Sequence, residues 1–424
     1  MLRRSAVALL LLVPVAACSD ESPAPSGDPE PTGQAVHAPD VVRGLTRLLD
    51  RRADAVRGDD QDDFLAGVDA SDANFLDDQQ TYFANLGQLP VGEFGYTIDP
   101  ASLTRSGRSY WAVVDVTLEL DGYDEVPVVT RDRYQFSRRQ GRYRLASVSD
   151  PTWEDTHDVQ TQPWDDGPVV VRYGSGVLGI FDPGSEVHAG DVVADVETGL
   201  ADVAARVPYD WDPRVVLYAL SDPAFLDGLE GLPGDDPQAL DAVAFPVPAS
   251  PEDGSAADTR FLLNPDMLDA RGEARARLIR HELTHVAVGA RADDAPTWLN
   301  EGIAEYVSVQ PMAPEDQTLS REALAAVEEG RVTGMPADDA FSGPDAEVAY
   351  AVAWWACEYV AATYDDDLLS FLLESMGSDD PDEVLELVVG VDADTLARRG
   401  AKLMKKTFAK RPAETGSPSA TPTD

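Results

Sequence analysis

Residues 278–289 read Leu-Ile-Arg-His-Glu-Leu-Thr-His-Val-Ala-Val-Gly, with two histidines spaced four residues apart. A run rich in Ala, Arg and Leu precedes it and Gly289 follows it, which predicts a helix that ends at the glycine. Residues four apart lie on one face of a helix, so His281 and His285 can direct two imidazoles at one metal ion, with Glu282 offset toward a bound water. Zinc suits these ligands, but a catalytic zinc site needs a third protein ligand.

A second predicted helix supplies a candidate for that third ligand. Residues 295–306 read Ala-Pro-Thr-Trp-Leu-Asn-Glu-Gly-Ile-Ala-Glu-Tyr, with the proline and threonine marking the start of the helix. Packed against the first helix, it can present Glu301 to the metal. Glu305 lies one turn further on and can accept a hydrogen bond from the free nitrogen of a ligand histidine, and we place Asn300 in the same layer around the ligands.

The two motifs together resemble the gluzincin metallopeptidases, and within them the peptidase-MA-like proteins with a His-Glu-Leu-Thr-His helix and a Trp-Leu-x-Glu-Gly-x-Ala-Glu-Tyr helix. The resemblance extends over residues 168–410. It implies a zinc-dependent hydrolase in which His281, His285 and Glu301 bind Zn²⁺ and Glu282 is the general base.

The sequence differs from the thermolysin and aminopeptidase N families in two features: the gap between the helices is shorter, and the Gly-Ala-Met-Glu-Asn exopeptidase motif is missing. We therefore expect an endopeptidase.

The expected reaction is hydrolysis of a peptide bond. Zinc lowers the pKa of its water from ~15.7 toward ~7, and Glu282 takes the proton and passes it to the leaving amine. The developing oxyanion needs a second donor besides zinc. No histidine follows His285, so tyrosine is the expected donor, and Tyr350 is the first choice; its alternative role is that of an aromatic residue facing the core. The other candidate donors to the oxyanion are Tyr306 and Tyr359.

Residues 260–263 could form an edge strand that aligns the backbone of a peptide substrate.

The N-terminus predicts a lipoprotein. Residues 1–17 have a basic start and a short apolar run, as in a signal peptide, and Val15-Ala16-Ala17-Cys18 resembles the bacterial lipobox. Cys18 would then carry a diacylglycerol and hold the mature protein on the extracytoplasmic face of the cell membrane. The alternative is an ordinary secretory signal with an incidental cysteine. Residues 18–39 and 413–424 are too poor in apolar residues to fold, which predicts a disordered tether and a disordered tail.

Two folded domains of an α+β protein are expected between these segments. Residues 40–165 predict helices followed by a curved antiparallel sheet, an architecture similar to the NTF2-like fold, which could serve as a ligand pocket, a pairing surface, a spacer or a substrate-positioning module. Residues 166–412 predict the metallopeptidase domain, with a small sheet followed by helices.

In the first domain we predict helices over 41–56 and 62–83 and strands over 110–120, 126–136 and 143–148, with a turn at Gln140-Gly141. In the second we predict strands over 169–180, 214–220 and 260–263 and a helix over 192–207.

The net charge of the chain limits the classes of molecule that it is expected to bind. The chain has 424 residues with 77 acidic and 33 basic side chains, so its net charge is −44. Such a surface repels phosphate backbones, which argues against nucleic acid as a partner. We expect a protein or peptide substrate, and membrane attachment only through the lipid on Cys18. Two other functions stay open: a partner-binding lipoprotein of the cell envelope whose metal site is vestigial or structural, and a hydrolase of a non-peptide amide in the cell wall.

Overall fold

The computed structural model describes residues 34–409, apart from 158, 223–224, 226–239, 253–254, 293 and 379. The predicted signal peptide, Cys18 and the predicted tail over 413–424 lie outside the described residues. Part of the predicted tether lies inside them. There, Gln34–Ala35 form the short strand β1, and the Val36 N–H donates to the carbonyl of Leu103 at 3.0 Å, so ordered structure begins before residue 40. No described helix is long and apolar enough to cross a membrane.

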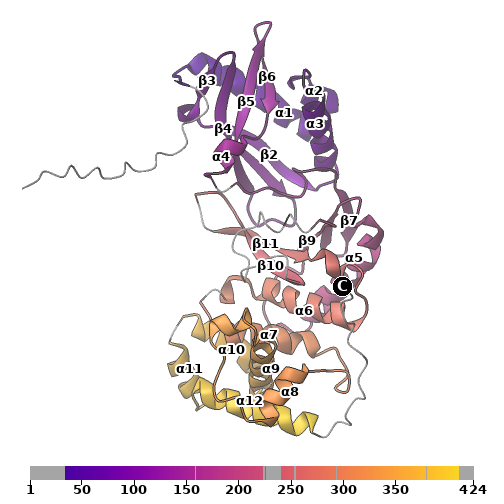
Figure 1. Ribbon diagram of the computed structural model, residues 1–424, viewed down its shortest axis with the longest axis vertical. Helices are drawn as coiled ribbons and strands as arrows, with labels where there is room; N and C mark the ends of the chain where they lie inside the picture. Colours follow the sequence, from indigo (N-terminus) through magenta and orange to yellow (C-terminus); the bar gives the residue numbers. More distant parts are fainter. Residues whose placement is uncertain are drawn as a thin grey trace, which may run out of the picture.

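Three layers follow one another along the long axis of the molecule (Figure 1). A sheet with the helices α1 to α4 occupies one end, a second sheet lies in the middle, and a group of helices forms the other end. This arrangement of mixed helix and sheet, with the C-terminal part helical, confirms the predicted α+β class.

The N-terminal layer is a six-stranded antiparallel sheet that helices cover. Its long strands alternate between buried and less buried residues, which puts one face against the helices. Gln140 and Gly141 have φ of +48° and +78° and form the predicted tight turn between two of the strands. The elements are β1, α1 (Pro39–Arg57), α2 (Gln61–Leu65), α3 (Ala73–Leu86), β2 (Val91–Ile98), β3 (Thr104–Ser106), β4 (Ser109–Leu120), β5 (Val128–Arg139), β6 (Arg142–Ser147) and α4 (Pro151–Glu154).

The structure corrects one prediction in this layer and contains a strand that was not predicted. The helix expected over 62–83 is two helices, α2 and α3, because the chain between them pairs with the sheet at Val68 and Asp72 then caps α3 by accepting the N–H groups of Asn74 and Phe75. Strand β2 was not predicted, although it pairs with β4 over almost its whole length.

The middle layer is a mixed five-stranded sheet in the order β10-β11-β9-β8-β7. The single strand expected over 169–180 is a hairpin, because Gly176, with φ of +77°, turns the chain. The prediction of an edge strand over 260–263 is wrong: those residues belong to β11, which pairs with β9 on one side and β10 on the other. Among the described strands the two edges of this sheet are β7 and β10, and β10 is the free edge that contacts α6. The strands are β7 (Val170–Gly174), β8 (Val177–Phe181), β9 (Val215–Ala219), β10 (Ala242–Pro248) and β11 (Ala256–Leu263).

Both faces of the middle sheet are buried. On one face pack α5 (Ala189–Ala204) and α6 (Glu273–Val288), through residues such as Leu217 and Ile279. The other face packs against the N-terminal layer, where Tyr218 and Leu178 share a cluster with Phe94 and Leu118. The two predicted domains therefore share one apolar core.

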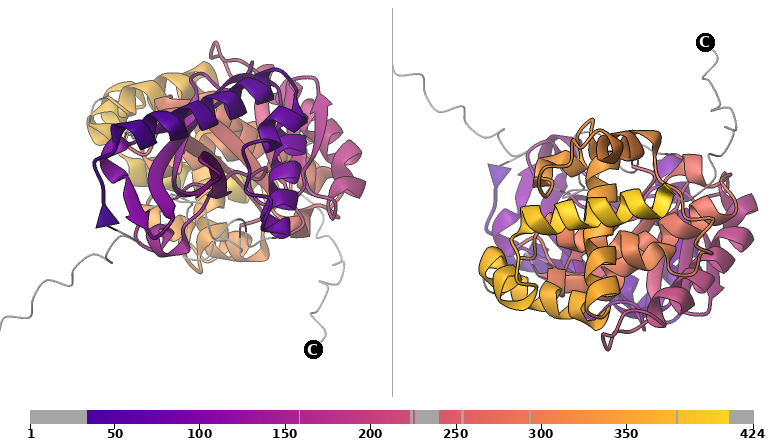
Figure 2. Two further views of the ribbon diagram at one scale, coloured as in Figure 1. Left: turned by 90° about the horizontal axis from the view of Figure 1, so that it is seen from above. Right: turned by 90° about the horizontal axis from the view of Figure 1, so that it is seen from below.

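The C-terminal layer contains six α-helices in the described part of the chain, and the first of them packs on α6. Gly302 allows the closest approach between α7 and α9, since a Cβ at this position would lie 2.7 Å from the carbonyl oxygen of Ala353. Seen from below, α12 lies across this end of the molecule (Figure 2), and it packs on α9. The helices are α7 (Thr297–Val309), α8 (Arg321–Glu328), α9 (Ala346–Thr363), α10 (Asp367–Met376), α11 (Pro381–Val388) and α12 (Ala393–Phe408).

Candidate metal centre

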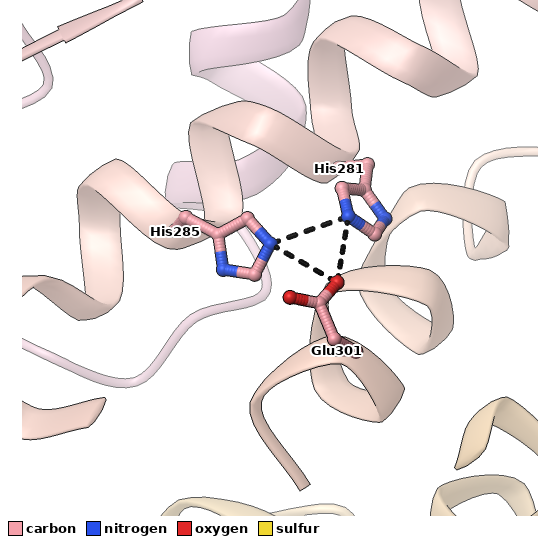
Figure 3. Close-up of side chains that lie close together, drawn as sticks. All are labelled: His281, His285 and Glu301. Carbon is pink, nitrogen blue, oxygen red and sulfur yellow. Dashed lines mark hydrogen bonds and ion pairs between the residues drawn. The ribbon is translucent and has the colours of Figure 1, made fainter. Parts of the chain in front are cut away.

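Three donor atoms from α6 and α7 converge on one point (Figure 3). His281 and His285 lie one turn apart on α6, and their Nε2 atoms are 3.2 Å apart. Glu301 comes from α7, and its Oε2 lies 3.3 Å from Nε2 of His281 and 3.5 Å from Nε2 of His285. These three atoms form a nearly equilateral triangle, and the three residues could hold a metal ion.

The triangle has the size that a zinc ion requires. Tetrahedral zinc holds nitrogen and oxygen donors at about 2.0–2.1 Å, which places any two of them roughly 3.3–3.4 Å apart. Oε2 of Glu301 is also buried with no hydrogen-bond partner. A buried acceptor without a donor costs free energy, and a cation at the centre of the triangle would remove that cost. The donor set therefore fits zinc.

The outward-facing nitrogens of both histidines lie near oxygen atoms. Nδ1 of His285 is 3.2 Å from Oδ1 of Asn300. Nδ1 of His281 is 3.3 Å from Oε1 of Glu305, an ion-pair contact in which the ring is not aligned for a hydrogen bond. The other oxygen of Glu305 accepts from Arg277. Partners of this kind fix the orientation of an imidazole so that its other nitrogen faces the metal.

Negative charge gathers around the donor atoms. Burial alone would lower the pKa of His281, but Glu301 and Glu305 raise it well above its usual value. The pKa of His285 is raised as well, against the effect of burial, chiefly by Glu301. Burial would raise the pKa of Glu301, but the two histidines lower it. Glu301 is therefore held as a carboxylate, which is the form that binds a metal.

Glu282 follows the first histidine on α6 and points toward the middle sheet. Its side chain is buried, and its Oε2 accepts the backbone N–H of Ala244 at 2.9 Å. Ala244 lies in β10, so the free edge of the sheet borders the donor cluster. The charge of Glu282 contributes to the raised pKa of His281 and of His285.

Tyr350 on α9 lies beside the cluster. Its ring centroid is 6.1 Å from that of His281, and the ring of Phe341 contacts it edge-on at 5.2 Å. Burial raises the pKa of Tyr350, and the charges of Glu301 and Glu282 raise it further, so its hydroxyl stays protonated and able to donate. The hydroxyl of Tyr359 instead accepts from Arg399. Of the three tyrosines considered as donors, Tyr350 is the one in ring contact with a histidine of the cluster.

Two groups near the cluster were not predicted. The Ala244 N–H belongs to the backbone, and no pattern in the sequence marks it. Arg277, which contacts Glu305, could have been found, because it precedes His281 by one helical turn and an arginine there can reach the same carboxylate.

No match was found among protein-family models or among curated proteins. Several solved structures are similar to part of the chain, among them a hydrolase and a zinc metallopeptidase. Native yeast LTA4 hydrolase is 12% identical with a TM-score of 0.33, and the match covers 60% of this chain and 40% of that chain. A mutant of a two-domain M1 zinc metallopeptidase bound to L-arginine is 15% identical with a TM-score of 0.31, and the match covers 70% of this chain and 61% of that chain. The chain thus spans less than two thirds of the length of either protein.

Proposed function

We propose that this protein is a zinc-dependent metallopeptidase. The observation that carries the proposal is the triangle of His281 Nε2, His285 Nε2 and Glu301 Oε2, with edges of 3.2–3.5 Å, beside the carboxylate of Glu282. A site built only for stability needs ligands but no general base. A carboxylate next to the donors, held by one hydrogen bond from the edge of a sheet, supports hydrolysis instead.

Five residues would bind the metal or orient its ligands. His281, His285 and Glu301 would hold the zinc, while Glu305 and Asn300 would orient the two imidazoles. When bound, zinc supplies Lewis-acid chemistry: it polarises a carbonyl and acidifies water.

Two further residues act on the substrate. Glu282 would take a proton from the attacking water and deliver it to the leaving nitrogen. The hydroxyl of Tyr350 would donate a hydrogen bond to the carbonyl oxygen as that oxygen gains negative charge. Both side chains border the cluster, Glu282 from α6 and Tyr350 from α9.

The free edge of β10 supports an endopeptidase. Its seven residues read Ala-Val-Ala-Phe-Pro-Val-Pro, with no carboxylate to bind the free amino group of a substrate, and the exopeptidase motif is missing. An extended peptide can donate hydrogen bonds to the outward carbonyls of this edge, with chain continuing on both sides of the bond to be cut.

The expected setting is the extracytoplasmic face of a bacterial membrane. Val15-Ala16-Ala17-Cys18 supports a diacylglycerol anchor on Cys18, and the acidic surface argues against contact with nucleic acid. Residues 40–165 would then stand between the anchor and the metal site, as an NTF2-like module that positions the rest of the chain.

The test combines zinc content with hydrolysis of casein for the full mature chain. The wild type and Glu282→Gln should each contain about one zinc per chain, and Glu301→Ala should contain almost none. Casein hydrolysis should be lost in both variants and kept in Glu322→Gln, which removes an exposed carboxylate on α8. Unchanged hydrolysis by Glu282→Gln would overturn the mechanism. Zinc without hydrolysis of casein in the wild type would favour a cell-wall amide, if peptidoglycan fragments are cut, or otherwise a partner-binding lipoprotein.

A further inference from the structure

A second polar pocket lies in the N-terminal layer, away from the metal centre. It has a volume of about 640 Å³, and its walls are α1, α2 with the chain that follows it, and the turn between β5 and β6 with the start of β6. These elements lie at the end of the molecule opposite α7 to α12 (Figure 1). A pocket of this volume fits a small molecule.

Arginines dominate the lining of this pocket. Five of its lining residues are arginines, against the single acidic residue Asp63. This is unusual for a chain with 77 acidic side chains and 33 basic ones. The local excess of positive charge is therefore built by the fold rather than by the composition. The five are Arg47, Arg51, Arg52, Arg142 and Arg144.

These arginines also differ from most others in their partners. Elsewhere in the described residues most arginines pair with a carboxylate, as Arg139 does with Asp69 and Arg172 does with Glu186. Among the described residues, none of the five forms an ion pair by distance. Arg144 donates to a backbone carbonyl, that of Ala66. No carboxylate among the described residues lies within ion-pair distance of these five arginines, so their positive charge is not paired there.

Arg52 is a fixed charge at the base of the pocket. Its residue is 4% exposed, and it donates to the hydroxyl of Tyr96 at 3.0 Å, to the carbonyl of Phe64 at 3.4 Å and to the side chain of Gln79. Its guanidinium lies 3.4 Å from the centroid of the Phe64 ring. All of these partners are neutral. A buried cation held only by neutral groups is costly, and an anion in the pocket would lower that cost.

We propose that this pocket binds a small ligand that carries a phosphate group. Guanidinium groups bind phosphate oxygens through paired, charge-assisted hydrogen bonds, and several arginines are needed to balance a doubly charged phosphate. The overall charge of −44 repels extended polyanions, so the ligand has to be compact enough to enter the pocket. The phosphate can belong to a soluble organic phosphate or to the headgroup of an anionic lipid.

The experiment measures binding to the chain without its signal peptide and with Cys18→Ser, so that no lipid anchor is present, by titration calorimetry with inorganic pyrophosphate and by cosedimentation with vesicles. The vesicles contain phosphatidylglycerol and phosphatidylcholine, or phosphatidylcholine alone. The pocket variant is Arg47→Ala/Arg142→Ala, which removes one exposed arginine from each of two walls. The matched control is Arg108→Ala/Arg321→Ala, which removes the same charge from exposed positions outside the pocket.

We expect saturable binding at one site per chain, weakened by about tenfold or more for each arginine lost from the pocket, and unchanged in the control. Binding of pyrophosphate alone identifies a soluble phosphate, and binding confined to phosphatidylglycerol vesicles identifies a lipid headgroup. The proposal is overturned if neither probe binds, or if the pocket and control variants weaken binding equally. Circular dichroism and thermal unfolding verify that both double variants are folded, and Arg47→Lys/Arg142→Lys, which keeps the charge, should bind more tightly than the alanine variant.

Discussion

The backbone N–H of Ala244 donates a hydrogen bond of 2.9 Å to Oε2 of Glu282. This single contact joins the free edge of the middle sheet to the carboxylate that we assign as the general base. It leaves the other oxygen of Glu282 available for water, and it fixes the position of the carboxylate relative to any peptide lying along β10.

Removal of that hydrogen bond should impair hydrolysis without unfolding the protein. Ala244→Pro removes the N–H, and Pro246 and Pro248 already occupy alternate positions of the same strand, where an outward N–H would face the free edge. We expect casein hydrolysis to fall by about 100-fold, because a small displacement of a catalytic group costs that much. Zinc content and the melting temperature should stay close to those of the wild type. Ala244→Gly keeps the N–H and serves as the control; equal rates in the two variants would contradict the assignment.

Glu305 should affect metal affinity through His281. Glu305→Gln keeps the volume but removes the charge that faces Nδ1 of His281 and Arg277. We expect the zinc dissociation constant, measured by competition with a chelator, to rise by about 10-fold or more. Glu322→Gln is the control because it removes an exposed carboxylate. An unchanged dissociation constant in Glu305→Gln would show that the contact does not orient the ligand.

Tyr350 should affect turnover rather than binding. Tyr350→Phe keeps the ring that contacts His281 and Phe341 but removes the hydroxyl. If the hydroxyl stabilises the oxyanion, kcat should fall by about 100- to 1,000-fold with little change in KM and in zinc content. Tyr359→Phe is the matched control. A wild-type kcat in Tyr350→Phe would leave the ring with a packing role, which is the alternative that the sequence left open.

Asp258 should make stability depend on pH in a narrow window. Burial raises its pKa to about 6, despite Arg260 at 3.0 Å. The unfolded chain has the ordinary lower pKa, so between about pH 4 and pH 6 the folded protein binds more protons, and stability falls as pH rises through that window and then levels off. The loss should be at most about 3 kcal/mol. Urea unfolding at pH 4.5, 5.5 and 7.5 should show this slope in the wild type and in the exposed-site control Asp338→Asn, and a smaller slope in Asp258→Asn.

The periodicity of apolar residues predicted the regular helices and strands of the fold. It failed for elements whose position depends on tertiary contacts. The alternating residues of β4 and the Gln140-Gly141 turn are visible in the sequence, and both are confirmed. Strand β10 was missed because two of its seven residues are prolines, which are tolerated only because they lie on a free edge. That same edge could not be assigned from sequence, since residues 260–263, which were expected to form an edge strand, lie in β11 between two other strands.

The candidate site was predictable where it depends on helical spacing. One turn separates His281 from His285, and the second motif brought Glu301, Glu305 and Asn300 into consideration. The distances between α6 and α7 depend on packing at positions such as Gly302, which no local pattern reveals. The arginine pocket is equally hidden, because its walls come from segments almost 100 residues apart.

The two sheets share apolar packing, so the predicted boundary near residue 166 does not separate two independent domains. Buried Asn85 donates to the carbonyls of Trp164 and Gly167 and accepts the N–H of Val169, so the supposed linker is fastened to α3. A fragment starting there would expose the apolar rear face of the sheet to water and would tend to aggregate. The half that carries the metal centre is therefore not an exchangeable module: we expect it to fold only when it is expressed together with the half that precedes it.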